Sequence, residues 1–409
     1  MASSAVSIIQ TGLIAEYRMD EGAGTTLNNS VVATGGGNLT LTGSPAWVAS
    51  GVDFQGGGDR FATGSFPSTA LSTMAAYVAF KWPSAATGDT ANAGLFCGDS
   101  INIFRIKPYW AAPHAPDFWF KGQVNGAAAS PNHADIKDDA WHVISAVYDG
   151  SHLYFYLDDL LVKKTAATLT SVTLTQLTLA GRDASGFSTD CIVGYALLYN
   201  TAHTTAQVKS NRQAIANVLS GRGVTMNVHQ TPCVQVGDSI SSYVSDSLWN
   251  ALTTRKLYIS LAVEGGAGIA DFEADAPNVD ALVHPARTNT LVVWGCGNNI
   301  TSSMTEAQVL AVVDRFDAYL LARRAAGWDR IVLVNLLPRN NANFLANRAI
   351  FNPAIEALDS YDVLADVAAD ATIGPDAAAS NASYYYDGTH LTTAANNIAG
   401  PIIATAVEV

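Results

Sequence analysis

The sequence predicts two domains, an antiparallel β-sandwich followed by a domain in which strands and helices alternate. The chain has 409 residues, of which 49% are hydrophobic and 14% charged, enough for two ordinary cores. Residues 12–200 are short β-rich runs separated by Gly, Asn, Asp and Ser. From Cys233 onward, apolar runs of strand length alternate with helical patterns. We expect a first domain at 1–221, a linker at 222–232 and a second domain at 233–409.

Composition and charge limit the classes of partner that the protein is expected to bind. A net charge of -13 provides no basic field for phosphate backbones or anionic lipid, so nucleic-acid binding is disfavoured and neutral partners are expected. No apolar stretch is long enough to span a bilayer. The cysteines lack metal-ligand spacing and are expected to be buried thiols, not a disulfide framework or a zinc site: Cys97, Cys191, Cys233 and Cys296.

Within the first domain, the clearest strands are Trp141–Tyr148 and His152–Leu157, which flank an Asp-Gly-Ser turn. An Asp-Asp turn follows, so a three-stranded meander is predicted. Residues 204–220 have near-helical spacing of apolar residues and open with a capping box, Thr204 and Gln207. This helix is expected to close the first domain.

Four blocks stand out in the first domain: GLIAEYRMDEGAGTTLNNS, GVDFQGGGDRFAT, WHVISAVYDGSHLYFYLDD and CIVGYALLYNTAHTTAQV. Over residues 10–208 they resemble the concanavalin A-like, laminin-G-like jelly-roll modules. Such modules often bind glycans, sometimes with a calcium ion, while others are spacers. Trp110, in the loop of KPYWAAPHAPDFWF, is a candidate glycan contact, with core packing as the alternative.

The tetrapeptide Gly-Asp-Ser-Ile occurs twice. The first copy, at residues 98–101, lies between β-rich runs, so its Ser100 is expected in a hairpin turn. The second copy, at residues 237–240, follows the strand CVQV and precedes a helical pattern. Ser239 is therefore expected at a helix N-terminus, where partial positive charge favours an oxyanion. A serine that only caps this helix is the alternative.

The second half predicts a parallel sheet with crossover helices, whose ligands bind beyond the carboxyl ends of the strands. Its clearest helix, residues 305–326, opens with the capping box of Thr305 and Gln308. His390 follows the last strand and is expected at the carboxyl edge of the sheet, with Asp387 able to fix its tautomer. His284 is expected at the opposite edge.

Two further loops leave strands at the same carboxyl edge. In EGGAGIAD, Gly265 and Gly266 can turn a backbone N–H inward because they lack a Cβ, and in GCGNNIT, Asn298 offers a side-chain amide. Both loops are candidate oxyanion donors, with ordinary strand-end turns as the alternative.

Together, GDSI, the Gly-rich loop, the Asn loop and DGTH resemble the four blocks of the SGNH (GDSL-type) hydrolases over residues 230–409. The resemblance implies a three-layer, flavodoxin-like α/β fold. It implies Ser239 as nucleophile and first oxyanion donor, Gly265 or Gly266 as the second donor and Asn298 as the third, with Asp387 and His390 completing a triad. The third block of the family usually reads Gly-x-Asn-Asp, whereas residues 296–299 read Cys-Gly-Asn-Asn, and the second block lacks its usual Asn. The choices between Asn298 and Asn299, and between the glycines, stay open.

The expected reaction is ester hydrolysis through an acyl-enzyme, without metal or organic cofactor. The association with a glycan-binding type of module favours O-acetyl esters of a polysaccharide. Tyr386, with Tyr384 and Tyr385, precedes the DGTH turn and is expected to contact substrate in the acyl pocket, with packing as the alternative for at least one of the three. The alternatives are a short-chain esterase or lipase with a spacer sandwich, and a non-enzymatic adhesion or phage tail component. The opening MASSAVSIIQTG does not read as a secretory signal, so the location stays open, with an extracellular or virion-associated one expected. The sequence does not indicate the oligomeric state.

Overall fold

The computed structural model describes residues 6–31, 37–55, 60–86, 94–99, 104–108, 116–120, 133–134, 136–158, 160–167, 172–181, 189–226, 233–252, 257–263, 266–280, 282–283 and 288–409. The chain separates into two compact units, Met1–Val228 and His229–Val409. Strands outnumber helices, and most of them belong to the first unit.

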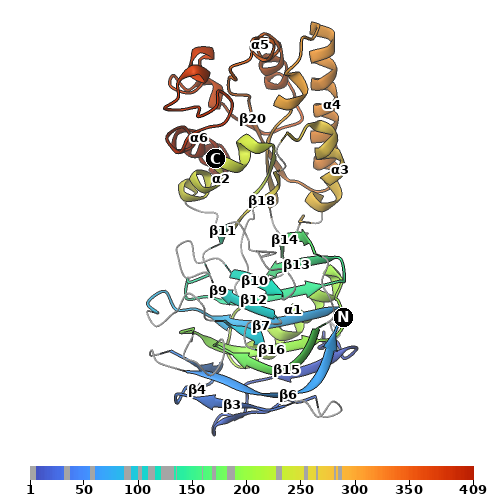
Figure 1. Ribbon diagram of the computed structural model, residues 1–409, viewed down its shortest axis with the longest axis vertical. Coiled ribbons are helices and arrows are strands. Elements are labelled where there is room, and N and C mark those ends of the chain that lie inside the picture. Colours follow the sequence, from blue (N-terminus) through green and yellow to red (C-terminus); the bar gives the residue numbers. More distant parts are fainter. Residues whose placement is uncertain are drawn as a thin grey trace. The chain divides into compact units, whose positions relative to one another are not determined.

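The first unit is a β-sandwich of two antiparallel sheets (Figure 1). One sheet has the order β14 (Leu160–Ala166), β13 (His152–Leu157), β12 (Trp141–Tyr148), β7 (Met74–Lys81), β16 (Ile192–Tyr199), β5 (Gly51–Asp53) and β4 (Ala46–Val48), and β1 (Leu13–Tyr17) also pairs with β16. The other has the order β10 (Pro116–Phe120), β9 (Phe104–Pro108), β8 (Phe96–Gly98), β15 (Val172–Leu179), β6 (Phe61–Leu71), β3 (Leu39–Thr42) and β2 (Thr26–Leu27). The predicted meander β12-β13-β14 and the predicted hairpin β8-β9 are confirmed.

The central strand β7 is apolar on both faces because both are covered. Its residues from Met74 to Phe80 are buried, although side chains alternate between the faces of a strand. Tyr77 and Ala79 belong to a core that also contains Val208 and Ile215 of helix α1 (Thr205–Ser220). Helix α1 opens with the predicted capping box and packs its apolar side chains on this sheet.

A buried histidine links β12 to the turn between β13 and β14. His142 Nδ1 lies 3.2 Å from Asp158 Oδ2, and its Nε2 lies 3.0 Å from Asp138 Oδ1. Burial alone would lower the pKa of His142, but the charge of Asp158 and the hydrogen bonds of both carboxylates outweigh it and raise the pKa to about 9. The imidazolium and its two carboxylates therefore form an ion triad inside the sandwich.

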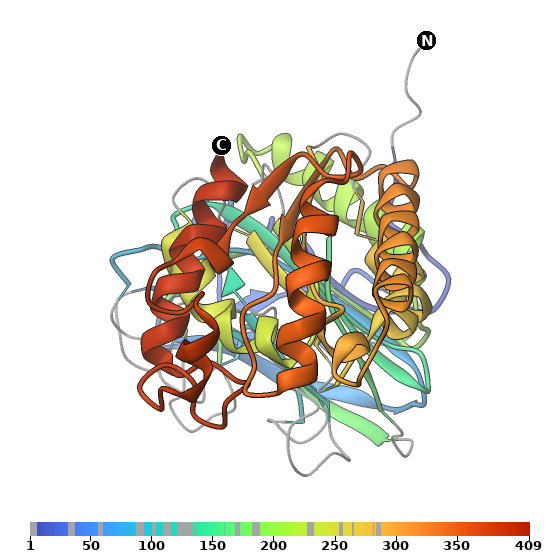
Figure 2. The same ribbon diagram turned by 90° about the horizontal axis from the view of Figure 1, so that it is seen from above.

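The second unit contains a parallel sheet whose strands have the order β18 (Leu257–Val263), β17 (Cys233–Gly237), β19 (Thr290–Trp294), β20 (Arg330–Val334) and β21 (Val363–Ala365). Helices α2 (Ser239–Ala251), α3 (Ile269–Asp280), α4 (Glu306–Ala325), α5 (Ala342–Glu356) and α6 (Thr393–Glu408) follow these strands in turn. Helices α2 and α6 lie on one side of the sheet and α3 and α4 on the other (Figure 1), and Figure 2 shows α5 beside α4. The predicted capping box of Thr305 opens α4.

Helices α2 and α6 pack unusually closely at a glycine. A Cβ on Gly400 would lie 2.5 Å from the carbonyl carbon of Ser247 and 2.7 Å from the backbone nitrogen of Leu248. Nearby, Ser247 Oγ donates a hydrogen bond of 2.8 Å to Asn397 Oδ1. The helix that begins at Ser239 is thus held against the last helix of the chain.

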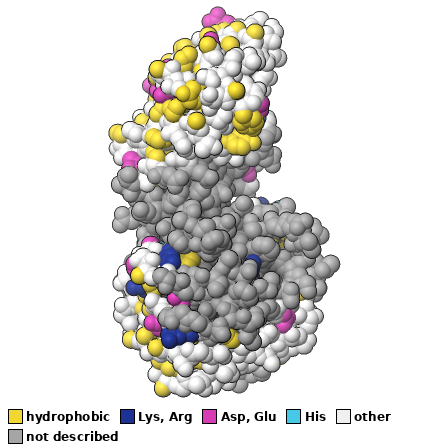
Figure 3. Space-filling view, turned by 60° about the vertical axis from the view of Figure 1, so that its left-hand side comes forward, with side chains coloured by type: hydrophobic (Ala, Val, Ile, Leu, Met, Phe, Trp, Pro, Cys, Tyr) yellow, Lys and Arg dark blue, Asp and Glu magenta, His cyan; other side chains and the backbone are white. Residues whose placement is uncertain are grey.

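The surface and the cysteines add a few findings about the described parts of the chain. No helix there is long and apolar enough to cross a membrane, and no cluster of three or more potential metal ligands is found there. The four cysteines are buried, as predicted. On the face seen in Figure 3, the coloured lysine and arginine side chains form small groups interspersed with acidic ones.

Candidate functional site

The second GDSI forms a tight strand-to-helix turn. Strand β17 ends at Gly237, where a Cβ would lie 2.4 Å from the carbonyl oxygen of Trp294, so only glycine fits without displacing the neighbouring strand. The side chain of Asp238 accepts a hydrogen bond of 2.9 Å from Ile240 N and thereby caps α2. Ser239 is consequently the first residue of the helix and is partly exposed.

Ser239, His390 and Asp387 form a continuous chain of hydrogen bonds, named here the Ser–His–Asp chain. Ser239 Oγ lies 2.9 Å from His390 Nε2, and His390 Nδ1 lies 2.6 Å from Asp387 Oδ2. Asp387 Oδ1 also accepts hydrogen bonds from Thr389 N and His390 N, at 2.9 Å and 2.7 Å. Three predicted residues, 151 positions apart at most, are therefore brought into contact.

The carboxylate of Asp387 stays ionised in this arrangement. Its partial burial would raise its pKa, but the hydrogen bonds from the backbone and ring of His390 and from Thr389 N outweigh that effect and lower the pKa below its ordinary value. An ionised Asp387 accepts from Nδ1 of His390, and in the neutral imidazole this tautomer lets Nε2 accept a hydrogen bond from the Ser239 hydroxyl.

A buried arginine, which the sequence analysis missed, holds the next layer of the site. Arg339 Nη2 lies 3.2 Å from Asp238 Oδ2, and Arg339 Nη1 donates to Asn298 Oδ1 at 2.7 Å. The side chains of Arg339 and Asp238 are 7% and 3% exposed, so this ion pair is shielded from water. Burial raises the pKa of Asp238, and the guanidinium opposes that shift.

Asn298 and Asn299 have different partners. Asn298 Nδ2 donates to the carbonyl oxygen of Ala267 at 2.9 Å and to Asp238 Oδ2 at 3.3 Å. Asn299 Oδ1 instead accepts from Ile269 N, at the start of α3, at 2.9 Å. Asn298 therefore faces the turn that carries Ser239, whereas Asn299 supports a neighbouring helix.

The loops that hold these residues contain two left-handed positions. Gly266 has φ +85, a left-handed conformation that glycine adopts without strain, while Gly265 lies outside the described residues. Cys296, where the SGNH pattern usually has glycine, has φ 70 and precedes a short 3-10 helix, Gly297–Ile300. A side chain is thus accommodated in a conformation that favours glycine, at a backbone cost.

Two tyrosines surround His390. Tyr386, predicted to contact substrate, stacks on the imidazole with ring centroids 5.6 Å apart and an interplanar angle of 18°. Tyr243, which the sequence analysis did not single out, meets the imidazole edge-on at 5.5 Å. Tyr386 Oη donates to Tyr243 Oη at 3.3 Å. Tyr243 is one helical turn beyond Ser239, a spacing that places both on the same helix face and was a usable signal.

The first GDSI has a different structure. Gly98 ends β8, and Asp99 adopts a left-handed conformation with φ 44. Its carboxylate accepts hydrogen bonds from the backbone nitrogen and the hydroxyl of Thr175, which lies in strand β15. Trp110, the candidate glycan contact, lies outside the described residues. So do Ser100 and His284, which were predicted to lie away from the catalytic site.

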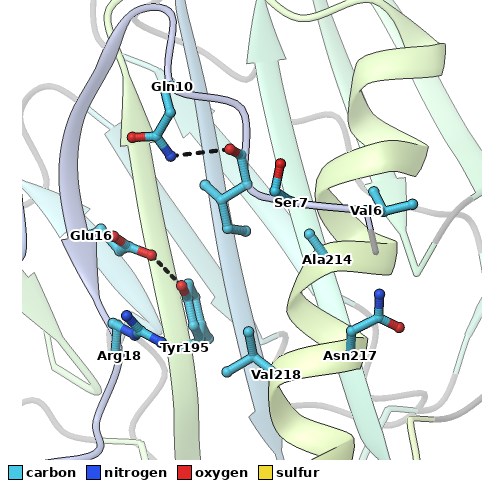
Figure 4. A pocket seen from close by; sticks show the side chains of 10 residues that line it. Val6, Ser7, Gln10, Glu16, Arg18, Tyr195, Ala214, Asn217 and Val218 are labelled. Carbon is cyan, nitrogen blue, oxygen red and sulfur yellow. Dashed lines mark hydrogen bonds between the residues drawn. The ribbon is translucent and has the colours of Figure 1, made fainter. Parts of the chain in front are cut away.

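The first unit also contains a pocket of about 440 Å³ between the segment from Val6 to Gln10, β1, β16 and α1 (Figure 4). Glu16 accepts a hydrogen bond from the Tyr195 hydroxyl in its wall, and Arg18 and Asn217 add polar groups. This pocket has a mixed polar and apolar lining and lies on the face of the sheet that also carries α1.

Comparisons with known proteins assign no family. No family model matches the chain, and no curated protein matches it. Among solved structures, the chain is similar to domain 4 of an extracellular arabinanase from Geobacillus stearothermophilus in complex with arabinotriose, with 13% identity, a TM-score of 0.37, and coverage of 50% of this chain and 100% of that one.

Two further solved structures are similar at the same level. Trypanosoma rangeli sialidase has 9% identity and a TM-score of 0.40, over 52% of this chain and 34% of that one. A botulinum neurotoxin type C structure has 10% identity and a TM-score of 0.38, over 50% of this chain and 51% of that one. At these identities and TM-scores, the likenesses carry no argument about function.

Proposed function

We propose that the protein is a serine ester hydrolase of the SGNH type, with a flavodoxin-like three-layer second domain. The observation that carries the proposal is the Ser–His–Asp chain at the N-terminus of α2, with Ser239 Oγ 2.9 Å from His390 Nε2. The sheet order, in which the first strand of the unit lies between the second and third, supports the fold because it is the doubly wound order with a ligand crevice at the carboxyl edge.

In the proposed reaction, His390 Nε2 takes the Ser239 proton as Oγ attacks the ester carbonyl carbon. The tetrahedral intermediate collapses when the bond to the alcohol oxygen breaks and His390 returns its proton to that oxygen. Water then attacks the acyl-serine with His390 again as base, which releases the acid and restores the serine. Asp387 stabilises the imidazolium throughout.

The negative oxygen of the intermediate needs preorganised donors. The backbone N–H of Ser239 at the helix N-terminus, an N–H of the loop at Gly266 and the Asn298 amide are the proposed donors. The bond from Asn298 Nδ2 to Asp238 is the longer of its two, so it is the one to be exchanged for the oxyanion. Arg339 neutralises Asp238, which would otherwise repel an oxyanion at this position.

For substrate, we propose a short acyl ester of a carbohydrate, with the sandwich as a glycan-binding accessory module. The rival functions are a general short-chain esterase with a spacer sandwich and a non-enzymatic adhesion or tail component. Acetate release from a panel of acetylated polysaccharides, with the Ser239→Ala protein as control, tests the proposal. Release by the wild type alone supports it. Equal release by both proteins, or none from any polysaccharide or soluble acetate ester, contradicts it.

A further inference from the structure

Tyr243 and Tyr386 expose their rings although they surround a residue of the Ser–His–Asp chain. The two residues are 49% and 53% exposed, among the most exposed large apolar residues of the described chain. Each ring has its centroid within 6 Å of the His390 imidazole, one parallel to it and one edge-on. Exposed aromatic rings beside a reactive group indicate a surface that a substrate covers.

The part of the ester that meets these rings follows from the chemistry of His390. Its Nε2 must return a proton to the oxygen of the departing alcohol, so that oxygen lies within hydrogen-bond reach of the imidazole. The carbonyl oxygen points instead toward the donors around Asn298 and Gly266. Rings packed against the imidazole therefore lie beside the alcohol part of the ester, not beside its acyl part.

The shape and polarity of the pair suit a sugar ring. The planes of Tyr243 and Tyr386 meet at 80°, and their hydroxyls lie 3.3 Å apart, so the pair forms a corner with apolar faces and polar edges. A pyranose matches this pattern because its C–H face packs on an aromatic ring while its hydroxyls reach polar atoms at the rim. A long alkyl chain would gain little here, because both tyrosines are exposed and bury little apolar surface around a ligand.

The charges near the corner favour a neutral sugar. Asp387, the residue after Tyr386, carries an ionised carboxylate whose side chain is 42% exposed. Arg339 is buried and already binds Asp238 and Asn298, so its charge is not available to an anionic ligand. A carboxylate on the sugar would consequently be repelled at close range.

We infer that Tyr243 and Tyr386 form the subsite for the alcohol part of the ester, and that this alcohol is a neutral sugar ring. The inference rests on the ester hydrolase function proposed above and specifies its substrate class.

The kinetic test compares two acetate esters of similar reactivity, a monoacetylated methyl β-xylopyranoside and ethyl acetate. Tyr243→Ala and Tyr386→Ala should each lower kcat/KM about tenfold on the pyranoside, mainly through KM, because a stacking surface is lost. On ethyl acetate, which has no ring to stack, the loss should be clearly smaller than on the pyranoside. Tyr243→Phe and Tyr386→Phe keep the rings and should keep most of the preference, and Tyr361→Ala, at a distant, partly exposed tyrosine, should change neither rate. An acetylated glucuronide should react more slowly than the pyranoside.

An equal loss on both esters in the two alanine variants would overturn the inference while leaving the proposed function intact. Equal rates on the glucuronide would overturn the assignment to a neutral sugar. If the wild type hydrolyses neither ester, the proposed function is wrong, and a sugar-binding experiment then tests the subsite by itself.

For that purpose, saturation-transfer NMR measures methyl β-xylopyranoside binding to the Ser239→Ala protein. Contact with the sugar ring protons, weakened by adding Tyr243→Ala, supports the subsite, and no contact overturns it.

Discussion

The two GDSI segments, one in each unit, show how little a tetrapeptide determines by itself. In the first, Asp99 joins two strands of a sheet by accepting hydrogen bonds from Thr175. In the second, Asp238 caps a helix and is itself held by Arg339. The difference arises from the next element of the chain, which is strand β9 after the first segment and helix α2 after the second. Only a helix provides a positive N-terminal end beside the serine.

Each unit also contains a histidine paired with an aspartate, and the same contrast holds. Both ring nitrogens of His142 face carboxylates, and its side chain is fully buried. His390 has one carboxylate, a hydroxyl at its other nitrogen and a side chain that is 24% exposed. A histidine with a carboxylate at each ring nitrogen stays charged at neutral pH, whereas one that faces a hydroxyl can exchange a proton with that hydroxyl.

The sharpest test of the comparison exchanges each serine for alanine. Ser239→Ala should lower kcat by on the order of 10⁴-fold or more, as loss of a nucleophile does, with melting temperature close to wild type. Ser100→Ala in the first copy should leave kcat unchanged. Hydrolysis of a soluble acetate ester measures both, and Ser242→Ala, at an exposed position of α2, serves as a local control. An inactive Ser100→Ala protein would reverse the assignment of the two copies.

Asn298, the proposed oxyanion donor, can be compared with its neighbour Asn299, which supports helix α3. Asn298→Ala should lower kcat on the order of 10² to 10³-fold with KM little changed, because the proposal makes its amide one preorganised oxyanion donor. Asn299→Ala removes the acceptor for Ile269 N and should instead lower stability by about 1 kcal/mol. Steady-state kinetics and chemical denaturation of both variants measure the difference, and the opposite pattern would move the oxyanion donor to Asn299.

The stability that Asp238 and Asp99 contribute can be compared by removing the side chain that binds each carboxylate. Arg339→Ala leaves the buried Asp238 without its cation and should cost roughly 3 kcal/mol or more of unfolding free energy, together with a loss of kcat. Thr175→Ala removes only a neutral hydroxyl from Asp99 and should cost about 1 kcal/mol, with activity unchanged. Denaturant titrations with an activity assay measure both effects. A costless Arg339→Ala would show that Asp238 is not held as described.

The buried His142 gives a dependence of stability on pH. Because its pKa is raised from 6.5 to about 9 on folding, its contribution is complete below pH 6.5 and is lost as the pH rises through 9. The loss should be on the order of 3 kcal/mol for the sandwich. Calorimetry from pH 6 to pH 10 follows it, and in His142→Gln the slope over this range should be much smaller. An unchanged slope in that variant would assign the pH dependence to other groups.

The sequence predicts features that depend on neighbours in the chain. The capping boxes at Thr204 and Thr305 are present because a cap and its partner are three residues apart. The meander and the strand-to-helix turn before Ser239 are equally local, since they follow from turn residues and periodicity. Asn298 and His390 could be predicted to lie near Ser239 because the carboxyl ends of parallel strands share one edge.

The missed features depend on long-range contacts. Arg339 meets Asp238 across 101 positions, and Tyr386 meets Tyr243 across 143, and no local pattern marks either pairing. The left-handed Cys296 was also not predictable, because its loop replaces the glycine that normally signals such a conformation. Exposure was equally out of reach, although it is what distinguishes Tyr386 from the buried Tyr385 beside it.

The close packing of α2 against α6 at Gly400 has a consequence for the protein during its synthesis. Ser239 emerges from the ribosome 151 residues before His390, and α6, which packs on the helix that begins at Ser239, follows later still. A nascent chain that has reached β21 carries Ser239 and the proposed oxyanion loops but not yet the proposed base, His390. If Ser239 is the nucleophile and His390 its base, ester hydrolysis cannot begin before residue 390 has been synthesised, so the first turnover is a late event in the synthesis of this unit.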